Sequence, residues 1–263
     1  MVDPVPQLES LPVERGTRVL VRADFNVPLR DGVIDDDLRI TAALPTIEYL
    51  RERGAKVVCC SHLGRPKGKV DPQYSLAPVA QRLGELLGAT VELSPQVAGF
   101  ESLGMSQGIE PGAVMMIENL RFDPGEEANN PSFATNLSQL GDAYVDDAFG
   151  AAHRAHASIV GPPRVLPAAA GRLLAFIRLA RGRARRGETS ACGRLVLDDG
   201  EQFFRVLAAR AARTPSGLLV LLARADVPFG VFLAAGAFLA YVAGRAVLGT
   251  LLGSPPLPSR LLP

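Results

Sequence analysis

The first part of the chain alternates between short apolar runs, typical of buried strands, and longer segments with helical periodicity. Strands are predicted over residues 18–23, 56–61, 90–93, 113–117 and 143–146. Helices are predicted over residues 38–53, 76–87 and 132–140, with a short one between residues 94 and 111. Strands and helices that alternate at this spacing predict an α/β fold, a doubly wound parallel sheet with right-handed crossovers.

Polar segments follow the predicted strands. The first run, VLVRADFNVPL, stops at Asp24 and Asn26, and Pro28 forbids further ladder hydrogen bonds. The segments DLRI, SHLGRP, ENLRF and HRAHAS come later, each at a strand end or in the loop beyond it. Ligands of open α/β sheets bind at the carboxyl ends of the strands, so we expect these segments to converge on one site.

Four of the polar residues at these positions are arginines, namely Arg39, Arg65, Arg121 and Arg154. A guanidinium group offers phosphate or carboxylate a fixed fork of donors and stays charged at neutral pH. Together the four would suit a ligand that carries about three negative charges. A lone arginine after a strand is most often a surface residue, but four at equivalent positions favour an anion site.

Other residues of the same segments complete the predicted site. Asp24 is expected to orient an arginine or to accept a hydrogen bond from a ligand hydroxyl, and Asn26 adds a neutral donor. His62 lies in a Gly/Pro loop, which favours a ligand donor over a core histidine, and Gly64 would let the backbone approach the ligand. His153 and His156 could form a metal pair, but they have no third ligand in the sequence, so no metal is expected.

Charge divides the chain in two near residue 163. Residues 1–163 carry 14 Lys and Arg against 22 Asp and Glu, whereas residues 164–263 carry 14 against 5, for a net charge of +1. We therefore predict an α/β domain over residues 1–163 and an atypical, Arg-rich tail over residues 164–263. Only three lysines occur in the chain, which indicates GC-rich coding and favours codon composition over nucleic-acid binding as the origin of the tail arginines.

Three interpretations of the tail remain open. It holds a basic helix candidate over residues 173–186, and residues 227–244 form an uncharged apolar run of 18 residues, the lower limit for a membrane span. The run fits a membrane-associated helix, a buried helix of a soluble domain, or translation in an altered reading frame. The altered frame is favoured, because GC-rich genes read out of frame tend to give Ala, Arg, Leu, Gly and Pro.

The cysteines and the first residues bear on the compartment. Cys59 and Cys60 are adjacent in an apolar run and Cys192 is isolated, which is neither a metal-ligand spacing nor a disulfide framework. The first twelve residues lack a basic segment followed by an apolar one, so no signal peptide is expected. A cytoplasmic chain with reduced thiols is the simplest expectation.

Five co-linear motifs resemble the N-terminal domain of the phosphoglycerate kinase family. They are VRADFNVP, DDDLRI, SHLGRPKG, ENLRF with the following GEE, and DDAFGAAHRAHAS, in that family's order and spacing. The resemblance implies a Rossmann-like domain that binds 3-phosphoglycerate, and a C-terminal domain that binds MgATP. A hinge would close the two domains, and phosphoryl transfer between ATP and the substrate carboxylate would form 1,3-bisphosphoglycerate.

Carried over to this sequence, the resemblance implies specific site residues and a small-molecule substrate. Arg39 would be the catalytic residue, stabilising charge on the phosphoryl group in transfer. The substrate contacts implied are Asp24, Asn26, Arg39, His62, Leu63, Gly64, Arg65, Arg121 and Arg154. The resemblance implies a monomer in glycolysis, with no nucleic-acid partner, and a membrane partner is not favoured.

The tail departs from the family. The family's nucleotide segment, of the form GGAKVSDK, and its later Gly-rich loops have no match here, and no lysine follows Lys69. No GxxxxGK[ST] or GxGxxG pattern offers a substitute. MgATP is therefore expected for the family without a recognisable nucleotide site in this chain, and little or no turnover is expected of the chain alone. The alternative is a non-catalytic 3-phosphoglycerate-binding module, held at a membrane through residues 227–244 in one version.

Overall fold

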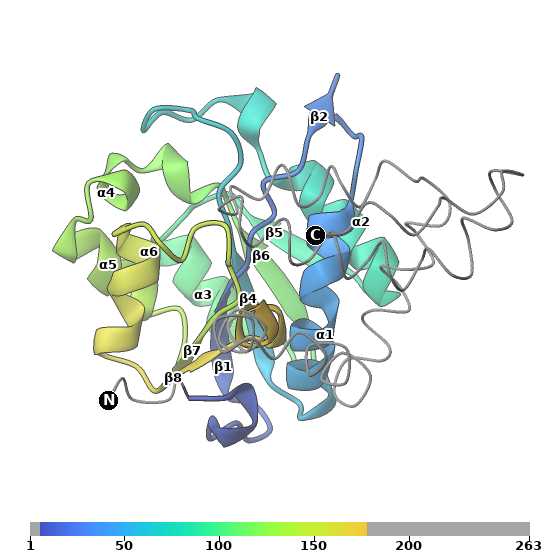
Figure 1. Cartoon of the computed structure of the whole chain (residues 1–263), viewed down its shortest axis with the longest axis vertical. Coiled ribbons are helices and arrows are strands. Elements are labelled where there is room, and N and C mark those ends of the chain that lie inside the picture. The colour runs from blue at the N-terminus through green and yellow to red at the C-terminus, as the bar shows by residue number, and fades with distance from the viewer. Residues whose placement is uncertain (1–5, 178–263) are drawn as a thin grey trace, which may run out of the picture. The chain divides into compact units, whose positions relative to one another are not determined.

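A computed structural model of the chain describes residues 6–177, which are built around a parallel sheet of six strands (Figure 1). The strands stand in the order β5-β6-β4-β1-β7-β8, and each neighbouring pair is parallel. Their bounds are β1 Arg18–Arg22, β4 Lys56–Cys60, β5 Val91–Ser94, β6 Val114–Ile117, β7 Ala143–Asp146 and β8 Ala168–Ala170. The parallel, doubly wound sheet predicted from the sequence is confirmed.

Helices cover both faces of this sheet (Figure 1). One face carries α1 Leu38–Glu52 and α2 Ala77–Leu87. The other carries α3 Phe100–Gly108, α5 Pro131–Ser138 and α6 Ala157–Val160, with α4 Pro124–Glu127 beside them. Short 3-10 turns occur at η1 Leu8–Ser10, η2 Pro72–Tyr74, η3 Leu120–Phe122 and η4 Pro162–Arg164.

The central strand β1 shows why the sheet needs helices on both sides. Val19 and Val21 are fully buried in the core that contains α1 and α2, while Leu20 between them is fully buried in the core that contains α5. Successive side chains of a strand point to opposite faces, so a strand buried on both faces has an apolar run in place of alternation. The apolar runs of the sequence are the consequence of this two-sided burial.

The predicted strands and helices are found within about two residues of their expected bounds, but β8 was not predicted. Its three alanines have no strand pattern, and they are recognised only by their pairing with β7, in which Ala168 lies opposite Tyr144. The sheet therefore continues past residue 163, where the sequence analysis ends the first domain. Residues 172–177 are helical, which overlaps the start of the helix predicted over residues 173–186, and the rest of that helix lies outside the described residues.

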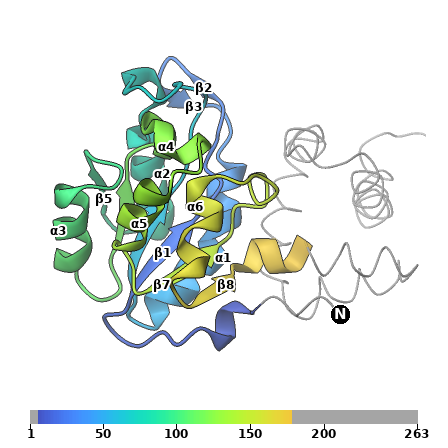
Figure 2. The ribbon, with the colours of Figure 1, turned by 90° about the vertical axis from the view of Figure 1, so that its left-hand side faces the viewer.

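The loops at the carboxyl edge of the sheet extend beyond its strands. Directly after β1, a hairpin forms between β2 Leu29–Arg30 and β3 Val33–Ile34, and its turn holds Asp31 and Gly32 at φ of 50° and 77°. Both central residues of such a tight hairpin turn need positive φ, which explains why Asp and Gly stand at these two positions. Figures 1 and 2 both show this hairpin at the same end of the sheet as the long loop between β4 and α2.

Two expectations from the sequence concern membranes and thiols. No helix within residues 6–177 is long and apolar enough to cross a membrane. The apolar run of residues 227–244 and Cys192 lie outside the described residues.

Cys59 and Cys60 are fully buried at the end of β4, and burial raises the pKa of both thiols.

Candidate functional site

Asp24 and Arg39 form an ion pair at the carboxyl edge of the sheet. Arg39, in the first turn of α1, donates from Nη1 to Asp24 Oδ2, and the two side chains are 18% and 9% exposed. Asp24 follows the end of β1, so the pair joins the loop after β1 to the start of α1. A carboxylate that holds a guanidinium in this way fixes the direction of its remaining donors.

The loop after β4 is tied to the loops on both sides of it through Gly64. The Gly64 N–H donates to Asn26 Oδ1 at 2.9 Å, and the Gly64 carbonyl accepts from Arg121 Nη1 at 2.7 Å. Gly64 has φ of +60°, and a Cβ here would overlap the Tyr74 ring. Glycine is therefore required by both the backbone conformation and the packing, and the residues after β1, β4 and β6 are brought together.

Asn119, which the sequence did not single out, holds the same loops together through hydrogen bonds of its side chain. Its fully buried side chain accepts from the Leu63 N–H at 3.2 Å and from the Arg121 N–H at 3.0 Å. It donates to the carbonyls of Leu63 at 2.7 Å and Tyr74 at 2.9 Å. Its four hydrogen bonds position Leu63 and the backbone that carries Arg121.

Arg121 is the most enclosed of the four predicted arginines. It is 5% exposed, and burial is the main reason that its pKa is lowered. Its Nε lies 2.9 Å from Glu127 Oε1, an ion pair whose angles are not those of a hydrogen bond. Arg121 is thus held by the Gly64 carbonyl and by a partly exposed carboxylate.

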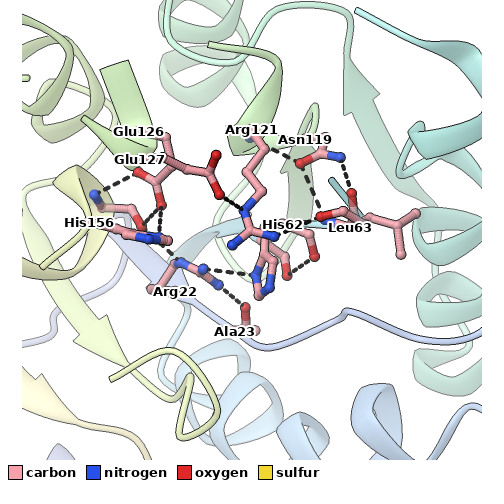
Figure 3. Close-up of polar contacts among 12 residues, drawn as sticks. Arg22, Ala23, His62, Leu63, Asn119, Arg121, Glu126, Glu127 and His156 are labelled. Carbon is pink, nitrogen blue, oxygen red and sulfur yellow. Dashed lines mark hydrogen bonds and ion pairs between the residues drawn. The ribbon is translucent and has the colours of Figure 1, made fainter. Parts of the chain in front are cut away.

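Arg22, a second residue that the sequence analysis missed, lies fully buried at the end of β1. Its Nε donates to Ser158 Oγ at 3.0 Å, its Nη1 donates to the Ala23 carbonyl, and its Nη2 lies 3.1 Å from His62 Nδ1. Figure 3 shows it between Glu126 and His62. An arginine inside an apolar strand pattern was interpreted only as part of the strand, although a buried charge with no visible partner in the sequence was a signal.

Glu126 is a buried carboxylate that shares the Ser158 hydroxyl with this arginine. It accepts from Ser158 Oγ at 2.6 Å and from the Ser158 N–H at 2.9 Å, and His156 Nδ1 lies 3.7 Å from Glu126 Oε1. Burial alone would raise the pKa of Glu126, but His156, the charge of Arg22 and the Ser158 hydrogen bonds outweigh it, so that the pKa is lowered. Glu126 is therefore ionised at neutral pH and offsets the charge of Arg22.

The pKa of His62 reflects its burial and the positive charges around it. His62 is 6% exposed, and its pKa is lowered well below the usual range, first by burial and then by the charges of four arginines. These are Arg22, Arg121, Arg154 and Arg39. His62 is therefore neutral at pH 7, and three of the four arginines predicted from the sequence lie near enough to act on it.

Arg65 and Arg154 differ in their surroundings. Arg65 is exposed on the loop after β4, next to Gly64. Arg154 is partly buried in the loop after β7, and its charge lowers the pKa of both His62 and Arg121. The structure thus gathers Arg39, Arg121 and Arg154 around His62, with Arg65 at the surface of the adjoining loop.

The chemistry of this edge suits a small anion. Within residues 6–177, no three His, Cys, Asp or Glu side chains are arranged to hold a metal ion. His156 faces Glu126, and His153 is exposed. Guanidinium groups and backbone N–H groups are typical donors to phosphate and carboxylate oxygens.

Comparisons with known proteins match most of this chain to one family. The family model described as phosphoglycerate kinase matches residues 9–177. A phosphoglycerate kinase of Thermomicrobium roseum is 48% identical over 210 residues, which is 80% of this chain and 51% of the relative. That of Moorella thermoacetica is 57% identical over 157 residues, which is 60% of this chain and 40% of the relative.

Solved structures show the same likeness. The phosphoglycerate kinase of Coxiella burnetii matches with a TM-score of 0.63 and 40% identity, covering 69% of this chain and 45% of that one. The enzyme of Pyrococcus horikoshii OT3 matches with a TM-score of 0.63 and 35% identity, covering 68% and 45%. The chain spans about half the length, or less, of the curated relatives that it matches.

Proposed function

This chain belongs to the phosphoglycerate kinase family, and on that premise we propose that its α/β domain binds 3-phosphoglycerate at the carboxyl edge of the sheet. The proposed contacts are Asp24, Asn26, Arg39, His62, Leu63, Gly64, Arg65, Arg121 and Arg154. The observation that carries the proposal is the gathering of Arg39, Arg121 and Arg154 around a neutral His62. A phosphate monoester and a carboxylate together carry about three negative charges at neutral pH, which three guanidinium groups can balance.

The reaction proposed for this site is the transfer of a phosphoryl group between ATP and the substrate carboxylate. A carboxylate oxygen of 3-phosphoglycerate bonds to the γ-phosphorus of ATP as the bond from that phosphorus to the bridging oxygen breaks, which yields 1,3-bisphosphoglycerate and ADP. The charge in transit lies on the three outer oxygens of the phosphoryl group. Arg39 is the proposed catalytic residue, because Asp24 holds its guanidinium at the edge of the sheet.

Preorganised positive charge of this kind contributes a large part of a phosphoryl-transfer enzyme's rate. The loss of one donor aimed at the transition state typically costs about 3–4 kcal/mol of barrier. Asp24 and Arg39 are both held before the substrate arrives, so the site needs little reorganisation.

We further propose that the nucleotide half of the reaction is truncated or altered in this chain, so that it turns over weakly or not at all by itself. MgATP is the cofactor that the family uses, and supplies the phosphoryl group when bound. No lysine follows Lys69 to contact its phosphates. A monomeric protein that acts in the cytoplasm is part of the same proposal.

The second candidate is a non-catalytic module that binds 3-phosphoglycerate, and the absence of later lysines from the sequence favours it. The two candidates share the substrate site and differ in turnover. In one version of this candidate residues 227–244 attach the module to a membrane. Full recovery of the chain in the supernatant without detergent would exclude that version.

The deciding experiment is calorimetric titration of the whole chain with 3-phosphoglycerate and then with MgATP, followed by a coupled assay of ATP-dependent turnover. Binding of 3-phosphoglycerate alone, with little turnover, is the expected result. No binding of 3-phosphoglycerate would overturn the proposed site. Binding of both ligands with turnover at ordinary kinase rates would overturn the proposed loss of the nucleotide half, and any turnover would exclude the non-catalytic module.

A further inference from the structure

We propose that Arg22 is a positioning residue that fixes His62 as the neutral tautomer with its proton on Nε2. His62 would then present a hydrogen-bond donor, and not a cation, to the bound anion. The tautomer follows from the contacts of Arg22 alone. Its use for 3-phosphoglycerate rests on the proposed function.

The position of Arg22 leaves its guanidinium no freedom to move. The side chain is fully buried, and Nε, Nη1 and Nη2 each have a different partner, on three different segments of the chain. A guanidinium group has five N–H donors and no acceptor. The direction of each of its hydrogen bonds is therefore known without observing any hydrogen atom.

On one side of Arg22, the donor and acceptor of each hydrogen bond are fixed from Arg22 through Ser158 to Glu126. Ser158 Oγ must accept from Arg22 Nε, so the single hydroxyl hydrogen of Ser158 is directed to Glu126 Oε1, 2.6 Å away. The other carboxylate oxygen, Oε2, accepts from the Ser158 N–H at 2.9 Å. Arg22 is thus held at Nε by a hydroxyl that is itself held by an ionised carboxylate (Figure 3).

On the other side of Arg22 the same rule fixes His62. Arg22 Nη2 lies 3.1 Å from His62 Nδ1, and because Nη2 can only donate, Nδ1 must keep its lone pair. A neutral imidazole carries one proton, which is then on Nε2. The protonated ring would place an N–H at Nδ1 against the N–H of Arg22 and lose this hydrogen bond.

The charges that face His62 from other elements also oppose its protonation. They are Arg22 at the end of β1, Arg121 after β6, Arg154 after β7 and Arg39 in α1. Burial and these four cations lower the pKa of His62. Geometry and electrostatics therefore agree on a neutral ring over the working pH range.

The Nε2–H of His62 is then available to a ligand. Nδ1 is turned toward Arg22, and Nε2 is the other nitrogen of the ring. Phosphate and carboxylate oxygens are acceptors only, so a ring with Nε2 unprotonated would repel them. Arg22 acts on the anion through His62, without contact of its own.

The test is long-range ¹H–¹⁵N NMR of the whole chain labelled at histidine, recorded without ligand from pH 5.5 to 8. The three histidines are distinguished by a His62→Gln variant. We expect His62 Nδ1 to resonate as an unprotonated nitrogen and Nε2 as a protonated one over this range. An Nδ1–H tautomer, or an imidazolium at pH 7, would overturn the proposal.

Two variants test the role of Arg22. In Arg22→Met the His62 signals should become those of a mixture of tautomers, and the apparent affinity for 3-phosphoglycerate should fall in proportion to the fraction of His62 left with its proton on Nε2, about twofold for an even mixture. Arg22→Lys keeps a cation and should restore part of both. The control is Arg18→Met, which removes another β1 arginine, paired with Asp142, and should leave the His62 signals unchanged.

These readouts separate the inference from the proposed function. The wild-type spectrum decides the tautomer even where Arg22→Met fails to fold. An unchanged His62 tautomer in a folded Arg22→Met variant would overturn the role of Arg22. Wild-type protein that shows the expected tautomer but does not bind 3-phosphoglycerate would overturn the proposed function and leave the role of Arg22 standing.

Discussion

Gly150 lies directly against the carboxylate of Asp24. A Cβ at residue 150 would overlap Asp24 Oδ2, and it would come within 3.5 Å of Arg39 Nη1. Gly150 belongs to the loop after β7, whereas Asp24 follows β1 and Arg39 lies in α1. A third segment of the chain therefore closes on the ion pair, and only a residue without a side chain fits there.

Gly150→Ala should weaken binding of 3-phosphoglycerate by about tenfold, or about 1.4 kcal/mol, with little loss of stability. Gly150 is not in the positive-φ region, so alanine is compatible with its backbone, and the group that must move is the end of the Asp24 side chain. Calorimetric titration and thermal unfolding measure the two effects. The control is Gly104→Ala in α3, where a Cβ meets nothing within 4 Å. An affinity unchanged in Gly150→Ala would show that the Asp24–Arg39 pair does not set binding.

Arg39→Met should weaken binding of 3-phosphoglycerate by about 1.5–3 kcal/mol, because it removes a charge-assisted hydrogen bond to the ligand. It also leaves Asp24, whose side chain is only 9% exposed, without its cation. We therefore expect the free energy of unfolding to fall as well, by about 1–3 kcal/mol.

A double variant separates these two effects of Arg39. Asp24→Asn together with Arg39→Met removes the unpaired carboxylate, so it should recover stability in urea unfolding without recovering affinity in calorimetry. Arg15→Met is the matched control, because Arg15 is exposed and precedes β1 at the opposite edge of the sheet. Recovery of affinity in the double variant would contradict a direct role of Arg39 in binding.

Asn119→Ala should destabilise the domain by about 2–4 kcal/mol, since it leaves buried backbone donors and acceptors in two loops without partners. Affinity for 3-phosphoglycerate should fall too, because Asn119 holds both Leu63 and the backbone of Arg121. Urea unfolding and calorimetry measure these effects. Asn136→Ala, on the exposed side of α5, should change stability by less than about 0.5 kcal/mol. Equal stability of the two variants would contradict the role given to Asn119.

The convergence of the loops could be predicted from the sequence because it depends on topology. Apolar runs place the strands, the alternation with helices makes them parallel, and parallel strands bring the residues that follow them to one edge. This topology was enough to predict that Asp24, His62 and Arg121 lie at the same edge. The strand β8 could not be found in the same way, since a run of three alanines has no periodicity of its own.

The contacts that hold the site residues in place could not be predicted, because they join segments that are distant in the sequence. Arg22 lies in the same apolar run as Asp24, but its partners Ser158 and His62 are 136 and 40 residues away in the sequence. Alternation along β1 places Arg22 on the face of Leu20, and so into the core on the side of α5. A buried arginine was visible in the pattern, but the residues that balance its charge became visible only in three dimensions.

Asp147, at the end of β7, is fully enclosed and links two helices. Its Oδ2 accepts from the Thr46 hydroxyl of α1 at 2.6 Å, and its Oδ1 accepts from the Leu174 N–H at 3.1 Å, in the helical residues 172–177. Burial, with a smaller contribution from the charge of Asp146, raises the pKa of Asp147 to about 7, although the hydrogen bonds oppose this shift.

The raised pKa of Asp147 predicts a pH-dependent stability. The ordinary pKa of an unfolded Asp is about 3.9, so between pH 4 and 7 the folded state holds a proton on Asp147 that the unfolded state has lost. The bound proton stabilises the folded state, and its contribution to the free energy of unfolding is complete below pH 4. Between pH 4 and 7 this contribution falls by about 1.4 kcal/mol per pH unit, and above pH 7 it is lost. Asp147→Asn cannot titrate, so the free energy of unfolding of the wild type minus that of the variant should decline from pH 5 to 7 and then level off.

Urea unfolding followed by circular dichroism at pH 5, 6, 7 and 8 measures this difference. Asp142→Asn is the control, because there the hydrogen bonds and charge of Arg18 outweigh burial and lower the pKa of Asp142. A carboxyl group whose folded pKa is lowered titrates below about pH 4 in both states, so this control should differ from the wild type by a constant amount over the same range. A difference between wild type and Asp147→Asn that is constant with pH would mean that Asp147 is ionised throughout, held by Thr46 and Leu174 more strongly than its burial opposes.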